Sequence, residues 1–130
     1  MSKEQRAEVV RDLLAKVRAA YAKQDWETVR ALHTTLSEMK PGRGILAEAG
    51  YMAVGAAIAG NNRRAARKVL ATLFENDYPR AVHYEFLARA CLDLKKYGNA
   101  ARASARAEAL QTEEAAAKGG SGPEGTASRS

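Results

Sequence analysis

The sequence predicts an all-α fold, a right-handed array of about three antiparallel helix-turn-helix repeats with six helices. Trp26, Asn62 and Tyr97 align three similar segments at steps of 36 and 35 residues, and a step of this size is typical of helical repeat arrays. Good helix formers (Ala, Leu, Arg, Lys and Glu) dominate residues 3–117. No run of alternating β-branched residues indicates a strand.

The first predicted pair of helices covers residues 3–23 and 26–39. Ser2 and Asp25 precede them as N-cap residues, whose side chains accept hydrogen bonds from the first turn. Apolar residues recur at helical spacing along both segments. They include Val9, Leu13, Val17, Ala20 and Tyr21 in the first helix, and Trp26, Val29, Leu32, His33 and Leu36 in the second.

The second predicted pair covers residues 45–59 and 63–75, after a break at 40–44 that contains Pro41 and two glycines. Most residues of the first helix are Ala or Gly, which lets neighbouring helices approach closely. Gly60 and Asn61 end it, and Asn62 starts the next helix. The apolar side of that helix consists of Ala66, Val69, Leu70, Leu73 and Phe74.

The third predicted pair covers residues 80–95 and 99–117, with a turn at 97–99. Pro79 suits the first turn of the fifth helix, because proline needs no N–H bond there. The buried side of the fifth helix is expected to contain Tyr84, Leu87, Ala88, Cys91 and Leu94, and that of the sixth Ala100, Ala103, Ala107 and Leu110. Residues 1–117 therefore form the predicted repeat domain.

Residues 118–130 form a predicted flexible tail rich in Gly and Ser. The alanine run before Lys118 and the Gly-Gly-Ser-Gly after it resemble an engineered linker, so we assign no function to this segment. The single cysteine excludes an intramolecular disulfide. Neither an apolar signal region nor a membrane-spanning run is evident, so we expect a soluble cytoplasmic protein.

The three segments resemble tetratricopeptide repeats, whose first helix carries a Trp-x2-Leu-Gly-x2-Tyr pattern and whose second carries Ala and then a large apolar residue. The third segment fits best, and Lys16 and Ser104 depart from the pattern. The matching residues are Tyr84, Leu87, Ala88, Cys91, Tyr97, Ala100 and Ala107; Ala49, Met52, Ala53, Ala56, Ala65 and Val69; and Leu13, Val17, Ala20, Trp26, Val29 and Leu36.

This resemblance implies a non-catalytic module, an adaptor or small chaperone, that binds a peptide or helix of another protein in a concave groove. The groove would be apolar at its centre and flanked by arginines that meet acidic groups. Alternatively, neighbouring helices of the same chain bury its apolar residues. The implied groove residues are Arg11, Leu14, Arg18, Tyr21, Tyr51, Val54, Ala57, Phe86, Arg89 and Leu92.

Two further features bear on the partner. The family's carboxylate clamp needs Lys and Asn, but Leu14, Arg18, Gly50 and Val54 occupy its positions, so a carboxyl-terminal tail is not expected as the ligand. The last helix exposes alanines with no capping helix after it, which favours self-association into a homo-oligomer.

A basic patch supports an alternative function, nucleic-acid or ribosome binding through phosphates. Arg63, Arg64, Arg67 and Lys68 lie together at the start of the fourth helix, where cations are mildly unfavourable, and the net charge is +6. Arg102 and Arg106 extend the patch in the predicted array. Against this alternative, no aromatic stacking platform is interleaved with these charges, and the patch is also compatible with an ordinary solvated surface.

The sequence offers no catalytic or metal-binding pattern. His33 and His83 are isolated, the one cysteine is Cys91, and no phosphate-binding glycine loop is present. No nucleophile has a base at a recognisable spacing. We therefore expect neither an enzyme nor a cofactor or metal.

Overall fold

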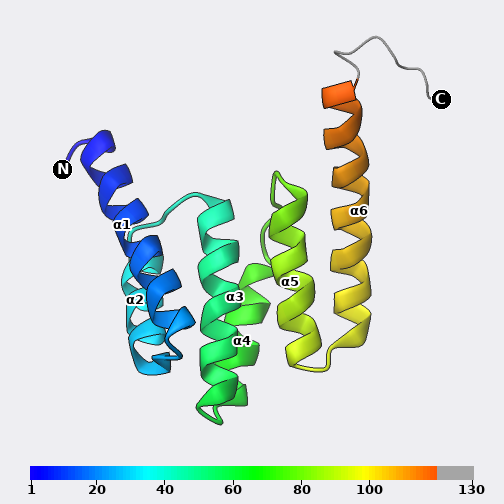
Figure 1. The fold of residues 1–130 in the computed structure, drawn as a ribbon. Helices are drawn as coiled ribbons and strands as arrows, with labels where there is room; N and C mark the ends of the chain where they lie inside the picture. Colours follow the sequence, from blue (N-terminus) through cyan, green and yellow to red (C-terminus); the bar gives the residue numbers. More distant parts are fainter. Residues whose placement is uncertain (120–130) are drawn as a thin grey trace.

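The computed structural model describes residues 1–119, which form six α-helices and no strand (Figure 1). This confirms the prediction of an all-helical chain with six helices. The helices are α1 (Lys3–Ala22), α2 (Trp26–Glu38), α3 (Arg43–Ala59), α4 (Arg63–Leu73), α5 (Ala81–Asp93) and α6 (Tyr97–Gly119). Of the tail predicted at 118–130, residues 118 and 119 belong instead to the last turn of α6, and the rest lies outside the described residues.

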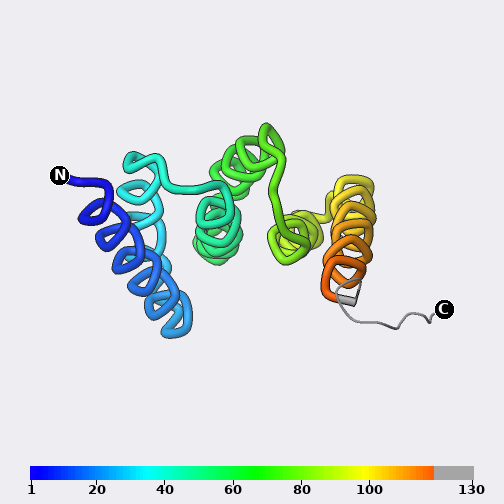
Figure 2. Tube along the Cα trace, turned by 90° about the horizontal axis from the view of Figure 1, so that it is seen from above, coloured from blue at the N-terminus to red at the C-terminus, as the bar shows by residue number. Residues whose placement is uncertain are grey.

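Successive helices reverse direction and pack in pairs, α1 with α2, α3 with α4, and α5 with α6. The pairs follow one another along the molecule, with α3 in the middle (Figure 2). The helix α3 contacts α1, α2, α4 and α5, whereas α4 makes no backbone contact with α6. This central place of α3 decides which of its residues can reach the surface.

The turns inside the three pairs share one construction. In each, a residue in the left-handed region comes directly before the N-cap residue of the second helix, with φ between 59° and 60°. The N-cap N–H then donates to a carbonyl five residues earlier, at 2.8–2.9 Å. The left-handed residues are Gln24, Asn61 and Lys95, and the N-cap residues are Asp25, Asn62 and Lys96.

This shared turn corrects the sequence alignment of the repeats. Its equivalent residues are Asp25, Asn62 and Lys96, so the steps are 37 and 34 residues. The sequence alignment paired Trp26 with Asn62, but the residue in the place of Trp26 is Arg63. The alignment is wrong by one residue. Such an error changes the direction assigned to each side chain of the helix by about 100°.

Three predicted helix starts also differ from the structure. The helix α3 begins at Arg43 rather than at residue 45, and α5 begins at Ala81, so Pro79 lies in the preceding loop. The helix α6 begins at Tyr97, so the predicted turn at 97–99 is the first turn of the helix. The turn before α6 closes on Lys95 and Lys96, which leaves Gly98 with an ordinary helical backbone.

The core consists of two hydrophobic clusters that meet at α3. One cluster joins α1, α2 and one side of α3, where Ala49, Met52 and Ala56 lie. The other joins the opposite side of α3 to α4, α5 and α6. Eight of the 17 residues of α3 are buried. The helix therefore has little surface left for a partner.

Two glycines of α3 allow its close packing against its neighbours. A Cβ atom at Gly50 would lie 2.7 Å from a methyl carbon of Leu73 on α4, and one at Gly44 would lie 2.4 Å from Nε2 of His83 on α5. Both distances are shorter than a normal contact. A larger residue at either position would therefore have to displace the side chain of Leu73 or His83.

Candidate protein-binding surface

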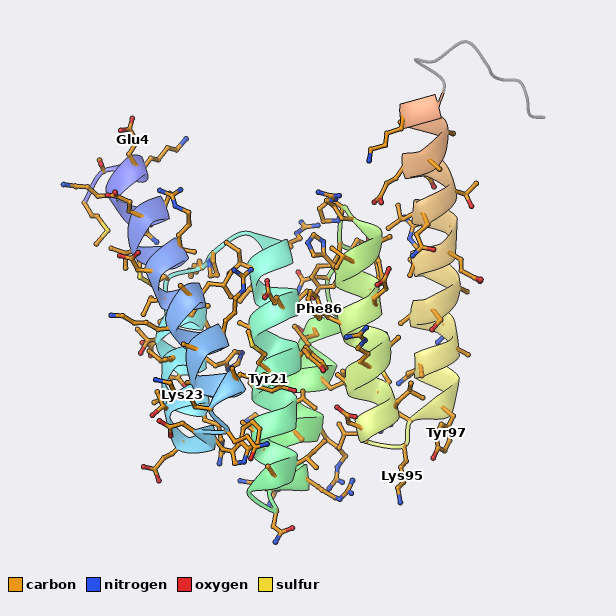
Figure 3. The ribbon with its side chains drawn as sticks, viewed as in Figure 1. Glu4, Tyr21, Lys23, Phe86, Lys95 and Tyr97 are labelled. Atoms are coloured by element: carbon orange, nitrogen blue, oxygen red, sulfur yellow. The ribbon has the colours of Figure 1, made fainter. Side chains whose placement is uncertain are left out.

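Four aromatic side chains, one each from α2, α1, α3 and α5, form a row that we call the aromatic row. The ring centroids of Trp26 and Tyr21 are 5.6 Å apart, those of Tyr21 and Tyr51 6.0 Å, and those of Tyr51 and Phe86 5.4 Å. All four side chains are partly exposed. Figure 3 shows Tyr21 and Phe86 on either side of α3, on the same side of the molecule.

The backbone of α3 holds the row in place. A Cβ atom at Gly55 would be 3.3 Å from a ring carbon of Tyr21, so this ring lies directly against α3. Tyr51 packs against both core clusters. Burial, a hydrogen bond to Tyr51 and the charge of Asp93 raise the pKa of Tyr21 to about 12, although Arg89 lowers it. The phenol is therefore neutral at physiological pH.

An ion pair beside the row joins α1 to α3. Nε of Arg18 donates to Oε2 of Glu48 at 2.6 Å, and its second nitrogen donates to Oε1 at 2.7 Å. The bidentate hydrogen bond to Glu48 raises the pKa of Arg18, against a smaller opposing effect of burial. The sequence predicts that Arg18 or Arg89 meets an acidic group of a partner. In the folded chain the Arg18 side chain is paired with Glu48 and keeps 56% of its surface exposed.

Arg89 and Leu92 provide the exposed part of the surface on α5. Leu92 has 52% of its surface exposed, and Arg89 makes no ion pair within residues 1–119. At about 100° per residue, Arg89 lies about 60° around α5 from Phe86 and Leu92 about 120° from it, with Arg89 between the other two. This end of the surface therefore combines an aromatic, an aliphatic and a cationic group.

Three predicted groove residues belong to the core instead. Leu14, Val54 and Ala57 have exposed fractions of 7%, 0% and 1%. Leu14 packs in the cluster with α2, and the other two face α4 and α5. The family rule treats the inner side of each first helix as free, but here α3 is covered on several sides. We therefore remove these three residues from the candidate surface.

Arg11 is also separated from the aromatic row. It is exposed, and it lines a hollow of about 270 Å³ at the start of α1, together with Arg6, Met39 and Ile45. The ten residues between Arg11 and Tyr21 correspond to about 15 Å along a helix. The surface that the structure supports is thus the aromatic row with Arg89 and Leu92.

Sequence reasoning missed three neighbours of this surface. Trp26 was assigned to the interior, and Glu48 and Asp93 were not assigned at all. Burial raises the pKa of Asp93, whose charge acts on Tyr21. Only Trp26 gave a usable signal, since it lies five residues after Tyr21 across a tight turn.

The basic patch lies on a different side of the molecule. Arg63, Arg64, Arg67 and Lys68 are exposed on α4, which Figure 1 shows behind α3. None of them forms an ion pair within the described residues. The carboxamide of Asn62 accepts the N–H of Ala65 at 3.0 Å and so caps this helix. The patch and the aromatic row are separate surfaces.

Within residues 1–119, no group of three His, Cys, Asp or Glu side chains is placed to hold a metal ion. No helix in this part of the chain has both the length and the apolarity needed to cross a membrane.

No known protein family, curated protein or solved structure matches the chain. Functional inference therefore rests on the geometry described above.

Proposed function

We propose that the chain is a non-catalytic protein-interaction module, an adaptor or small chaperone, built as a tetratricopeptide-like array. It binds a peptide or helix of a partner on the side where α1, α3 and α5 meet. The shared turns at Asp25, Asn62 and Lys96 support a repeat origin, since the same backbone geometry recurs three times. Repeat arrays of this kind use one side of successive hairpins as a binding surface.

The aromatic row is the observation that carries this proposal. Aromatic side chains add much contact area at a low cost in conformational entropy, and they are enriched where proteins bind one another. Here four of them lie in succession, one from each of four helices, with exposed surface remaining on each. A core that needed only to fill space could have buried these rings completely.

The charges beside the row indicate the chemistry of the ligand. Arg89 has no acidic partner in residues 1–119, and Leu92 is exposed next to it. A partner segment could place apolar side chains along the aromatic row and against Leu92. An Asp or Glu of the same segment, lying over α5, would pair with Arg89. Arg18 contributes less to such a ligand, because Glu48 neutralises it.

A peptide-display selection on the wild-type chain tests this proposal, followed by measurement of Kd by fluorescence polarisation. We expect selected peptides to combine aromatic or aliphatic residues with an acidic residue. Leu92→Asp and Arg89→Glu should each weaken binding about fivefold or more, since truncation of interface anchors costs more than about 1 kcal/mol. Both residues are exposed, so far-UV circular dichroism should remain helical.

Arg64→Glu is the matched control, because it makes the same charge reversal at an exposed arginine of α4. It should leave peptide binding unchanged. If Arg64→Glu weakens binding as much as Arg89→Glu does, the ligand recognises net charge and not this surface. If neither Leu92→Asp nor Arg89→Glu has an effect, the surface formed by the aromatic row with Arg89 and Leu92 is not the binding site.

A further inference from the structure

A second hollow lies between α4 and the start of α6, with a volume of about 400 Å³. It lies where α4 and α6 make no backbone contact with each other. The lining residues are Arg67, Leu70, Ala71 and Phe74 from α4, Lys96 from the preceding turn, and Asn99 and Arg102 from α6. None of these residues takes part in the aromatic row.

The polar lining of this hollow is cationic and lacks any acidic side chain. Arg67, Lys96 and Arg102 contribute three positive charges, and no ion pair within residues 1–119 neutralises them. The guanidinium of Arg102 donates a hydrogen bond to the carboxamide oxygen of Asn99, which restricts its orientation. Like charges brought together without a counter-charge repel one another, so an anion at this place would relieve a cost.

An aromatic ring lies among these cations. Phe74 has 38% of its surface exposed although it is apolar, and it lines the same hollow above the buried Leu70. The sequence shows no aromatic stacking platform interleaved with the basic patch, but in the folded chain the ring of Phe74 lines the same hollow as Arg67 and Arg102. Ring faces beside arginines are the combination that proteins use to bind bases and their phosphates.

The turn before α6 adds to the positive potential. Asp25 and Asn62 cap α2 and α4 with side-chain oxygens, whereas the equivalent residue before α6 is Lys96, which has only donors. The first N–H groups of α6 thus lack the side-chain acceptor that the other second helices have. This feature strengthens the site that the cations and Phe74 define.

We propose that this hollow binds a nucleotide unit, with its phosphate held by Arg67, Lys96 and Arg102 and its base against Phe74. The unit is supplied either by a free nucleotide or by single-stranded nucleic acid. Arg63 lies one helical turn before Arg67, where it would meet a neighbouring phosphate of a strand. The site is independent of the proposed protein-binding surface.

Fluorescence anisotropy with a labelled 12-nucleotide uridine RNA, measured on the full chain between 50 and 200 mM salt, tests this proposal. Phe74→Leu keeps an apolar group but removes the ring, so it should weaken binding about tenfold and leave the salt dependence unchanged. Arg67→Gln with Arg102→Gln should weaken binding and reduce the slope of log Kd against log salt by about 1.4, or 0.7 for each lost phosphate contact on a single strand. Competition by unlabelled UMP or AMP distinguishes a free nucleotide from a strand as the source.

Arg11→Gln with Lys16→Gln is the matched control, since it removes two exposed cations of α1 and should change binding little. Either of two results would overturn the proposal. One is that neither RNA nor mononucleotide binds at 50 mM salt. The other is that Phe74→Leu binds as the wild type does while an oligoglutamate peptide competes equally well, which would indicate an acidic protein or simple charge attraction. Peptide binding at the aromatic row should persist in all these variants.

Discussion

The carboxylate of Glu114, near the end of α6, accepts a hydrogen bond from the backbone N–H of Ala81, the first residue of α5. The distance from Oε2 to the nitrogen is 3.0 Å, across 33 positions of the chain. Arg80, the N-cap residue of α5, offers no side-chain hydrogen bond. A residue from the neighbouring helix therefore provides the cap, and its negative charge also suits the positive end of the helix dipole.

We expect Glu114→Ala to lower the free energy of unfolding by about 1 kcal/mol, the usual cost of losing an N-cap. Urea unfolding followed by circular dichroism measures this change. Glu113→Ala is the control, because this exposed neighbour makes no such bond, and it should change stability by less than about 0.5 kcal/mol. Equal effects of the two variants would show that the hydrogen bond to Ala81 contributes nothing.

Gly50 and Gly98 should respond to alanine in opposite directions. At Gly50 the added methyl group would lie 2.7 Å from the Leu73 side chain, so we expect a loss of about 1–3 kcal/mol. At Gly98 nothing lies within 4 Å, and the backbone is helical, so alanine should stabilise the chain by about 0.5–1 kcal/mol. Thermal unfolding of both variants gives the comparison, and a neutral Gly50→Ala would show that the Leu73 side chain can move aside at little cost.

The helices were predictable because their signals are local. Ser2, Asp25 and Asn62 cap the helices as the sequence indicated, and the alanine-rich and leucine-rich runs favour helix at every step. The start of α6 was missed for a local reason too. A lysine at residue 96 gives no capping signal, so the glycine at 98 was taken for the turn.

The candidate surface was less predictable because it depends on packing between helices. The resemblance to tetratricopeptide repeats implied Tyr21, Tyr51 and Phe86 as groove residues, and the structure brings them together. Val54 was assigned to the same surface and is fully buried. Periodicity shows which residues share a side of α3, but it does not show that two core clusters cover opposite sides of that helix. The Arg18–Glu48 pair, 30 residues apart, likewise needs the fold.

Cys91 should be unreactive in the folded chain. Its side chain has no exposed surface, and burial raises the pKa of its thiol to about 11, against smaller opposing effects of Lys96 and Arg102. Thiolate is the reactive form, so at pH 8 both access and ionisation are unfavourable. Labelling with a thiol-specific disulfide reagent should be slow without denaturant and fast in urea. Native labelling as fast as that of free cysteine would contradict the burial.

Acidification from pH 7 to pH 5 should destabilise the fold through its histidines. Burial lowers the pKa of His33, and burial together with Arg80 lowers that of His83. The unfolded chain therefore binds protons more readily than the folded chain does. The resulting stability is fully present above the unfolded histidine pKa of about 6.5 and is lost as the pH falls below it.

The urea midpoint at pH 7 and at pH 5 measures this loss for the wild type and for His33→Gln. Glutamine retains a polar group near the Ser37 hydroxyl, which lies 3.4 Å from Nε2 of His33, but it takes up no proton. The variant should therefore lose less stability than the wild type over this interval, and His33→Gln with His83→Gln should lose less still. Carboxylates contribute mainly at lower pH, so they should add little to the loss of stability between pH 7 and pH 5. If the double variant loses as much stability as the wild type does over this interval, neither histidine is held neutral by the fold.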